Sequence, residues 1–133
     1  MIGLDTNVLV RYITQDEPGQ SERATRLIET HCTAEQPGHV TLVVLCELVW
    51  VLRGAYRYDK GLVLQVLDAI LHAAEFVVER EDVAHQALSG WRDGSADFAD
   101  YVIVSINHAA GCDRTFTLDR RLSAHERAQL LSQ

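Results

Sequence analysis

The sequence is poor in the residues and runs that mark several classes of protein. Its 133 residues include two prolines and eight glycines, too few for a low-complexity or collagen-like chain. The three cysteines are odd in number and lack C-x-x-C spacing, which argues against a disulfide framework or a zinc site. No stretch reaches the ~20 uninterrupted apolar residues of a membrane-spanning helix, and the first residues lack the basic start of a signal peptide. We expect one soluble, cytoplasmic domain over residues 1–133, with no membrane partner.

Motifs of several enzyme classes are absent as well. There is no P-loop, no G-x-G-x-x-G and no G-x-S-x-G, which excludes the common nucleotide-binding loops and the serine-hydrolase elbow. The six histidines are scattered and never form H-E-x-x-H. Lys60 is the only lysine, and the net charge of −7 argues against a nucleic-acid binder unless the acidic residues gather in one place.

What is present is an alternation of short apolar runs with amphipathic stretches. Strands alternating with helices predict an α/β fold of three layers, α/β/α, with a central, mostly parallel sheet of four or five strands. Ligands of such sheets lie at the carboxyl ends of the strands. Strands are expected over residues 1–4, 39–42, 75–79 and 114–118, with a weaker fifth strand at 129–131. Helices are expected over 6–13, 17–32, 43–56, 59–71, 83–91 and 97–110, with Asp16, Asp59, Asp82 and Asp97 as caps.

Acidic residues stand at the ends of two predicted strands. Asp5 follows the first strand and Asp119 follows the fourth, so both belong to the same edge of a parallel sheet, although each also fits a simple helix cap. Glu47 lies in the apolar helix after the second strand, where a buried carboxylate needs a partner. That partner is an arginine, a proton or a cation, and a structural ion pair is the alternative to a functional site.

The stretch "ADFADYVIV" adds two more carboxylates, Asp97 and Asp100. Asp97 is placed to cap the helix that follows the turn, and this explains it fully. Asp100 falls in the first helical turn, where the helix dipole favours an acid by ~0.3–1 kcal/mol. The cap position needs no second acid, so this explains Asp100 only in part.

Together these carboxylates form a set that requires a cation. Without a counterion their mutual repulsion would be severe. Oxygen ligands of this kind suit Mg²⁺ or Mn²⁺, and such ions usually engage phosphates. The pattern therefore indicates metal-assisted phosphodiester hydrolysis by an activated water. The chain outside this set is only mildly acidic. The set consists of Asp5, Glu47, Asp97, Asp100 and Asp119.

The stretches "MIGLDTNVLVRYITQDEPGQSERA", "TLVVLCELVWVL", "ADFADYVIVSINHAAGC" and "RTFTLDRR" resemble PIN-domain ribonucleases, specifically the VapC-type toxins of type II toxin–antitoxin pairs. The resemblance implies that the family's four acids are Asp5, Glu47, Asp100 and Asp119. It implies metal binding by Asp5 and Asp100, with Asp97 and Asp119 as further candidates. It also implies that Thr6 and Asn7 orient Asp5 or a metal-bound water, and that Thr117 does similar work near the last acid.

The same resemblance implies a Mg²⁺-dependent endoribonuclease (Mn²⁺ as the alternative ion) that cleaves structured RNA of the tRNA or rRNA class. It implies a homodimer and a cognate VapB-type antitoxin. The apolar helices around residues 43–52 and 62–71 either supply those contacts or simply form the core. Arg120 and Arg121, beside Asp119, are candidates for RNA phosphate contacts.

Two other functions remain to be compared. A haloacid-dehalogenase-like phosphatase also has an aspartate after its first strand, but it needs a second acid where this chain has Asn7. A catalytically inactive PIN-fold binding module is the other alternative. All four matched acids are present, so nothing in the sequence indicates lost activity.

Overall fold

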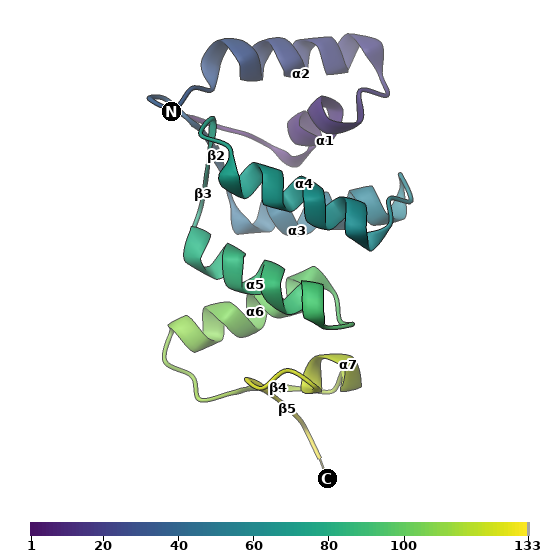
Figure 1. The fold of residues 1–133 in the computed structure, drawn as a ribbon, viewed down its shortest axis with the longest axis vertical. Coiled ribbons are helices and arrows are strands. Elements are labelled where there is room, and N and C mark those ends of the chain that lie inside the picture. Colours follow the sequence, from purple (N-terminus) through teal and green to yellow (C-terminus); the bar gives the residue numbers. More distant parts are fainter. Residues whose placement is uncertain (133) are drawn as a thin grey trace. The chain divides into compact units, whose positions relative to one another are not determined.

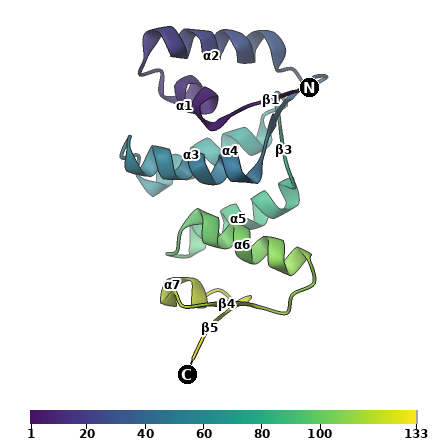
Figure 2. The same cartoon turned by 180° about the vertical axis from the view of Figure 1, so that it is seen from behind.

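A computed structural model describes residues 1–132 (Figures 1 and 2). The chain divides into two compact units, Met1–Glu79 and Arg80–Gln133. Each unit is described by itself below.

The first unit contains a parallel sheet whose strands are joined by pairs of helices. The strand order is β1-β2-β3, with Ile2 opposite Gly38 and Gly38 opposite Phe76. A Cβ atom at Gly38 would lie 2.7 Å from Leu4 Cδ1 and 2.8 Å from Cys32 Sγ, so only glycine fits this close approach. The elements are β1 (Ile2–Gly3), α1 (Thr6–Thr14), α2 (Pro18–His31), β2 (Gly38–Val40), α3 (Leu42–Gly54), α4 (Lys60–His72) and β3 (Phe76–Val78).

Helix α3 is the centre of this unit. It packs against α1 and α4, and α4 runs alongside it in both views; α1 also packs against α2. Leu45, Leu48 and Leu52 recur at helical spacing on α3 and are buried. Each buried leucine stabilises the fold by roughly 1.5–3 kcal/mol. On α4, Val63, Leu67 and Ile70 are buried as well, so part of the apolar surface of residues 43–52 and 62–71 forms the core.

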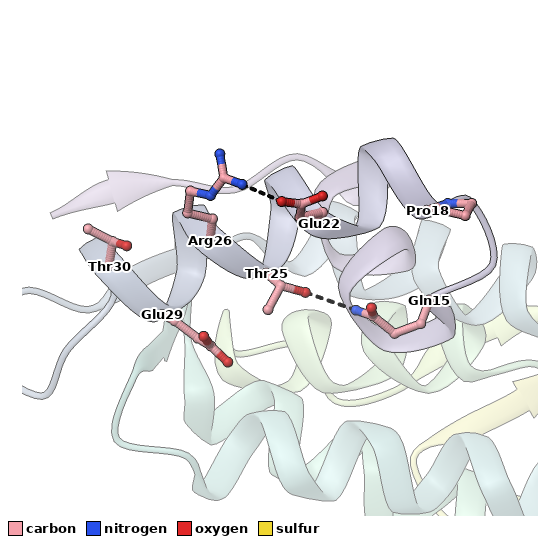
Figure 3. Close-up of a pocket in the computed structure, with 7 residues that line it drawn as sticks. All are labelled: Gln15, Pro18, Glu22, Thr25, Arg26, Glu29 and Thr30. Atoms are coloured by element: carbon pink, nitrogen blue, oxygen red, sulfur yellow. Dashed lines mark hydrogen bonds and ion pairs between the residues drawn. The ribbon is translucent and has the colours of Figure 1, made fainter.

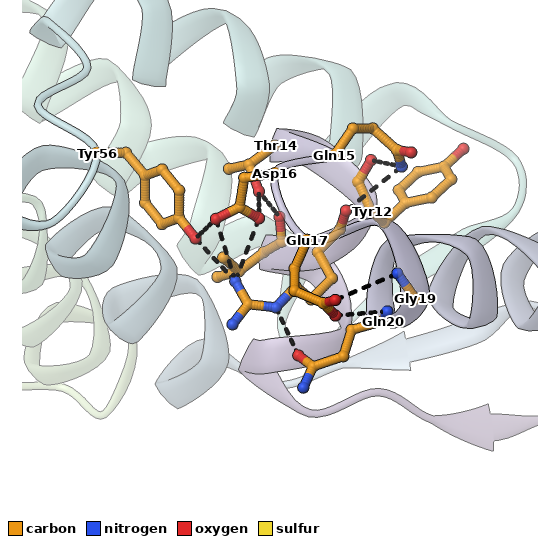
Figure 4. A network of polar contacts seen from close by, with 10 residues as sticks. Tyr12, Thr14, Gln15, Asp16, Glu17, Gly19, Gln20 and Tyr56 are labelled. Carbon is orange, nitrogen blue, oxygen red and sulfur yellow. Dashed lines mark hydrogen bonds and ion pairs between the residues drawn. The ribbon is translucent and has the colours of Figure 1, made fainter.

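A polar network fixes the loop between α1 and α2 (Figure 4). The Asp16 carboxylate accepts hydrogen bonds from the Tyr56 hydroxyl at 2.6 Å and the Thr14 hydroxyl at 2.8 Å, and Arg11 Nη1 lies 3.2 Å from it. The same Arg11 nitrogen donates to the Tyr56 oxygen at 2.8 Å. The Tyr56 bond, followed by that of Thr14, lowers the pKa of Asp16. The network ties this loop to the chain that leaves α3.

The second unit contains a helix pair and a small parallel sheet. Trp91 of α5 and Phe98 of α6 meet edge to face, with ring centroids 5.8 Å apart. A Cβ atom at Gly90 would lie 2.9 Å from Tyr101 Cδ1, which explains how closely the two helices approach. The elements are α5 (Glu81–Asp93), α6 (Phe98–Ala109), β4 (Thr115–Thr117), α7 (Arg120–Ser123) and β5 (Ala128–Leu130), and β4 pairs with β5.

Each predicted strand is present, and the weaker fifth one is confirmed as Ala128–Leu130. The first four strands are shorter than predicted, and at the second the last predicted residues belong to the start of the next helix. Thr41 and Leu42 were predicted to lie in the second strand, but Thr41 is the N-cap of α3 and Leu42 is its first residue. The hydrogen-bonded pairs form a three-stranded and a two-stranded parallel sheet.

Two of the predicted helix caps are wrong. Asp59 and Asp97 are N-caps as predicted. The N-cap of α2 is Glu17 rather than Asp16, because Pro18 fixes the first helical position and the cap must directly precede it. Arg80, with a left-handed backbone (φ 50°), precedes α5, and Asp82 pairs with its guanidinium at 3.0 Å.

Within the described part of the chain, no helix combines the length and the apolar character that crossing a membrane requires.

Candidate active site

The first acidic group lies in the first unit and consists of Asp5 and Glu47, joined through Thr6. Asp5 follows β1 and is the N-cap of α1, where its Oδ1 accepts the Thr6 N–H at 2.9 Å. The Thr6 hydroxyl donates to Glu47 Oε1 at 2.8 Å. Thr6 itself is buried, at 6 % exposure. One buried residue therefore holds both carboxylates in place.

This arrangement corrects one prediction. Glu47 was expected to be buried, but its side chain is exposed on α3, so burial does not explain its presence. That Thr6 orients Asp5 or a metal-bound water stays a prediction. Its backbone N–H bonds Asp5, and its hydroxyl bonds Glu47. Asn7 is exposed and lines a hollow beside α1 and α2.

The start of α3 is fixed by two acceptors. Thr41 Oγ1 accepts the Val44 N–H at 3.1 Å. Glu79 Oε1, just after β3, accepts the Leu42 N–H at 3.0 Å. These bonds satisfy N–H groups that have no partner within the helix. They set where α3 begins and hence where Glu47 projects from it.

The second acidic group lies in the second unit and consists of Asp97, Asp100 and Asp119. Asp97 and Asp100 form a capping box at the start of α6. In the better-formed half of this box, the Asp97 N–H donates to Asp100 Oδ2 at 3.1 Å. The return contact to the Asp97 side chain is looser, and the Asp100 N–H bonds the Asp97 carbonyl at 3.0 Å. Asp100 was expected to be dispensable for the cap, but its side chain accepts the better of the two hydrogen bonds in the capping box.

The ionisation of Asp100 shows that these carboxylates influence one another. Partial burial raises the pKa of Asp100, and the negative charges of Asp97 and Asp119 raise it further. The hydrogen bond from the Asp97 backbone and the charge of Arg121 act in the opposite direction. A raised pKa means that the ionised form is under-compensated. This is the condition that a bound cation relieves.

In this group, Asp119 is the acid whose negative charge is best balanced by a neighbouring positive charge. It is the N-cap of α7, and its Oδ1 accepts the Arg121 N–H at 2.8 Å. The Arg121 guanidinium lies 3.2 Å from Oδ2, and this partner lowers the pKa of Asp119. Thr117 Oγ1 accepts the Asp119 N–H at 3.0 Å, so Thr117 fixes the backbone at this position. Arg121 is thus held against a carboxylate, whereas the Arg120 side chain is exposed.

The donor atoms fit a hard divalent cation. Each candidate offers carboxylate oxygen, the ligand that Mg²⁺ and Mn²⁺ prefer. One oxygen of Asp100 is used in the capping box, which leaves the other for a ligand. Across residues 1–132, no three or more His, Cys, Asp or Glu side chains are gathered closely enough to hold a metal ion. The fit therefore rests on the chemistry of the donors.

One hollow of the first unit lies away from the candidate acids (Figure 3). It measures about 420 Å³ and runs along α2. Four of its polar residues have partners: Arg26 pairs with Glu22, and the Gln15 amide donates to Thr25 at 2.9 Å. None of the candidate acids lines it. Its lining is Gln15, Pro18, Glu22, Thr25, Arg26, Glu29 and Thr30.

The chain was compared with models of protein families and with curated proteins. The model of the PIN domain family matches residues 2–128, a range that runs through both acidic groups. A search of curated proteins found no match. The family match confirms the predicted fold class, a PIN-like α/β/α fold, here with a small sheet. The chain belongs to the PIN-domain family, whose members are generally nucleases that use a metal ion.

Proposed function

We propose that the protein is a Mg²⁺-dependent endoribonuclease in which Asp5, Glu47, Asp100 and Asp119 act together. The observation that carries this proposal is the single family match that runs through both acidic groups. The substrate class is structured RNA, either tRNA or rRNA. Mn²⁺ is the alternative ion, because it takes the same oxygen ligands.

The residues divide the work according to their contacts. Asp5 and Asp100 hold the cation, with Asp97 and Asp119 as additional ligands. The cation, when bound, supplies an acidified water and offsets charge that develops on the phosphate. Thr6 keeps Glu47 oriented through its 2.8 Å bond. Thr117 is a positioning residue that acts through the Asp119 backbone.

Asp97 and Asp100 have different parts in this proposal. The Asp97 side chain makes the looser half of the capping box. Asp97→Asn is expected to give a milder loss of cleavage than Asp100→Asn, together with a small loss of stability. Asp100 has a free carboxylate oxygen and an under-compensated charge, so it carries the chemistry.

The test is cleavage of total RNA by the purified protein with Mg²⁺, compared with EDTA and with Asp100→Asn. We expect EDTA and Asp100→Asn each to abolish cleavage. Asp113→Asn is the matched control, since it removes an exposed carboxylate of the same unit that lies outside the acidic group. Cleavage that survives EDTA contradicts the metal mechanism. Equal cleavage by wild type and Asp100→Asn contradicts the site, and no cleavage by wild type indicates an inactive binding module.

We further propose that the protein acts as a VapC-type toxin, functions as a homodimer and is inhibited by a VapB-type antitoxin. Expression of the chain in bacteria should then stop growth, whereas Asp100→Asn should not. Coexpression with the antitoxin encoded beside it should restore growth and yield a complex of the two proteins. Growth arrest by Asp100→Asn as strong as that by wild type contradicts a toxin that works through cleavage.

A further inference from the structure

Helix α3 exposes two large apolar side chains on the face that carries Glu47. Val43 is 67 % exposed and Trp50 is 56 % exposed. They lie four residues before and three residues after Glu47, which places all three on one side of the helix. The other large apolar residues of α3 are mostly buried in the core. They include Leu42, Val44, Leu45, Leu48, Val49 and Leu52.

The two tryptophans of the chain differ sharply in their surroundings. Trp91 is 4 % exposed and packs against Phe98. Trp50 presents most of its indole to solvent, although burying a ring of this size is strongly favourable. An aromatic ring in this position is available to a ligand.

We propose that Trp50 is a substrate-binding residue that stacks on a nucleobase of the RNA next to the bond that is cleaved. This inference rests on the proposed function and names the contact that would hold a single-stranded part of the substrate. Every base has a flat π-face, so stacking on an exposed indole suits RNA of varied sequence. The rise of ~1.5 Å per residue places Trp50 about 4.5 Å along the helix axis from Glu47. A base bound there belongs to a nucleotide close to the reacting phosphate.

The charge near Trp50 fits an RNA strand. Arg53 follows Trp50 by three residues, is exposed, and donates to the Tyr58 carbonyl at 3.2 Å. A guanidinium has further N–H groups with which it can bind a phosphate. Along α3 the order is thus a carboxylate of the candidate active site, a ring for a base and an arginine for the RNA backbone.

A second copy of this chain is a poorer occupant of the same face. Covering both Val43 and Trp50 would also bury Glu47 between them. In the described chain the polar partner of Glu47 is the neutral hydroxyl of Thr6. A carboxylate buried without a cation costs several kcal/mol. An RNA strand that stacks one base on Trp50 need not cover Glu47 and so avoids this cost.

The experiment measures binding separately from cleavage. A fluorescent single-stranded RNA of about 12 nucleotides, within the ~4–16 nucleotides of known single-strand sites, is titrated with protein in Ca²⁺ in place of Mg²⁺. We expect Trp50→Ala to weaken binding by about 5- to 150-fold, the factor that corresponds to ~1–3 kcal/mol of stacking. Trp50→Phe should retain most of the affinity. Val43→Ala, the matched control on the other side of Glu47, should bind like wild type.

Tryptophan fluorescence gives a second readout. The difference between wild type and Trp50→Phe isolates the emission of Trp50, and RNA should quench that emission to saturation. In Mg²⁺, Trp50→Ala should raise KM for the same RNA more than it lowers kcat.

Three outcomes overturn the inference. If wild type and Trp50→Ala bind the RNA with equal affinity and wild type cleaves RNA, Trp50 makes no stacking contact, and the proposed function still holds. Emission from Trp50 that shifts to the blue with protein concentration, in step with a doubling of mass, assigns the face to a second copy. Absence of both RNA binding and cleavage in wild type overturns the proposed function and this inference together.

Discussion

Replacing Asp100 separates the cost of its charge from the value of its hydrogen bond. Asp100→Asn removes the charge but keeps an oxygen that can accept the Asp97 N–H. Asp100→Ala removes both. The two variants should therefore differ by the capping bond alone, roughly 0.5–2 kcal/mol of unfolding free energy. For a chain of this size that corresponds to roughly 2–8 °C in Tm.

The pH dependence follows from the raised pKa of Asp100. Below the ordinary value of 3.8 the carboxyl is protonated in both folded and unfolded protein, so it has no effect on stability. As the pH rises through the raised folded-state pKa, the folded protein loses stability, because it must ionise a partly buried group beside Asp97 and Asp119. At neutral pH this cost is complete. Asp100→Asn should then be more stable than wild type, with an advantage that shrinks as the pH falls toward 3.8.

The assay is urea unfolding of wild type, Asp100→Asn and Asp100→Ala at several pH values between about 4 and 7. Cleavage of RNA is measured in parallel, and both variants should lose at least about 100-fold, since several kcal/mol of charge stabilisation is removed. Equal stabilities of Asp100→Asn and Asp100→Ala would refute the value of the capping bond. A stability of Asp100→Asn at neutral pH no higher than that of wild type would refute the charge cost. A stability gain of Asp100→Asn that does not change with pH would show that the gain does not come from the ionisation of Asp100.

Further substitutions test the contacts around the acids. Thr6→Val removes the hydroxyl that holds Glu47 and should lower cleavage by about 10- to 100-fold, as for other positioning partners at metal sites. Thr6→Ser keeps the hydroxyl and should keep the activity, so equal cleavage rates for the two variants would contradict the role of this hydroxyl. Tyr56→Phe removes the hydroxyl that binds the α1–α2 loop and should lower the urea midpoint, with no change in cleavage per folded molecule; a large loss of activity would speak against a purely structural network. Arg121→Gln removes the cation that lowers the pKa of Asp119, so the pH below which cleavage is lost should move upward, and an unmoved pH profile would show that Asp119 need not be ionised.

The sequence predicted those parts of the fold that depend on local pattern. The apolar spacing of α3 and the turn before Asp97 were enough to place both helices. The prediction of the fifth strand was weak because Ala128–Leu130 is only three residues long and its residue types have little preference for β-structure. The prediction that Asp16 caps α2 was wrong because the neighbouring Glu17 is the cap, and only the place of Pro18 decides between these two acids.

The candidate acids could be identified from sequence, but not their surroundings. Glu47 looked buried because its sequence neighbours are apolar, yet a helix has an exposed side even within an apolar stretch. Thr6 was noticed for its place beside Asp5, whereas its hydroxyl contacts a residue on another helix. Glu79, which caps α3, gave no signal, because its partner is far along the chain. Contacts between distant residues depend on packing, which no local pattern encodes.

The bond between Thr6 and Glu47 joins residues 41 positions apart, whereas Asp97 and Asp100 are separated by three and Thr117 and Asp119 by two. The second acidic group can thus take its local geometry as soon as one helical turn and one tight turn form. The first group must wait until α1 and α3 have packed, and closing that long loop is a slower and entropically costlier event. During refolding the protein should regain helix before it regains the orientation of Glu47, so catalytic competence should be among the last properties to return.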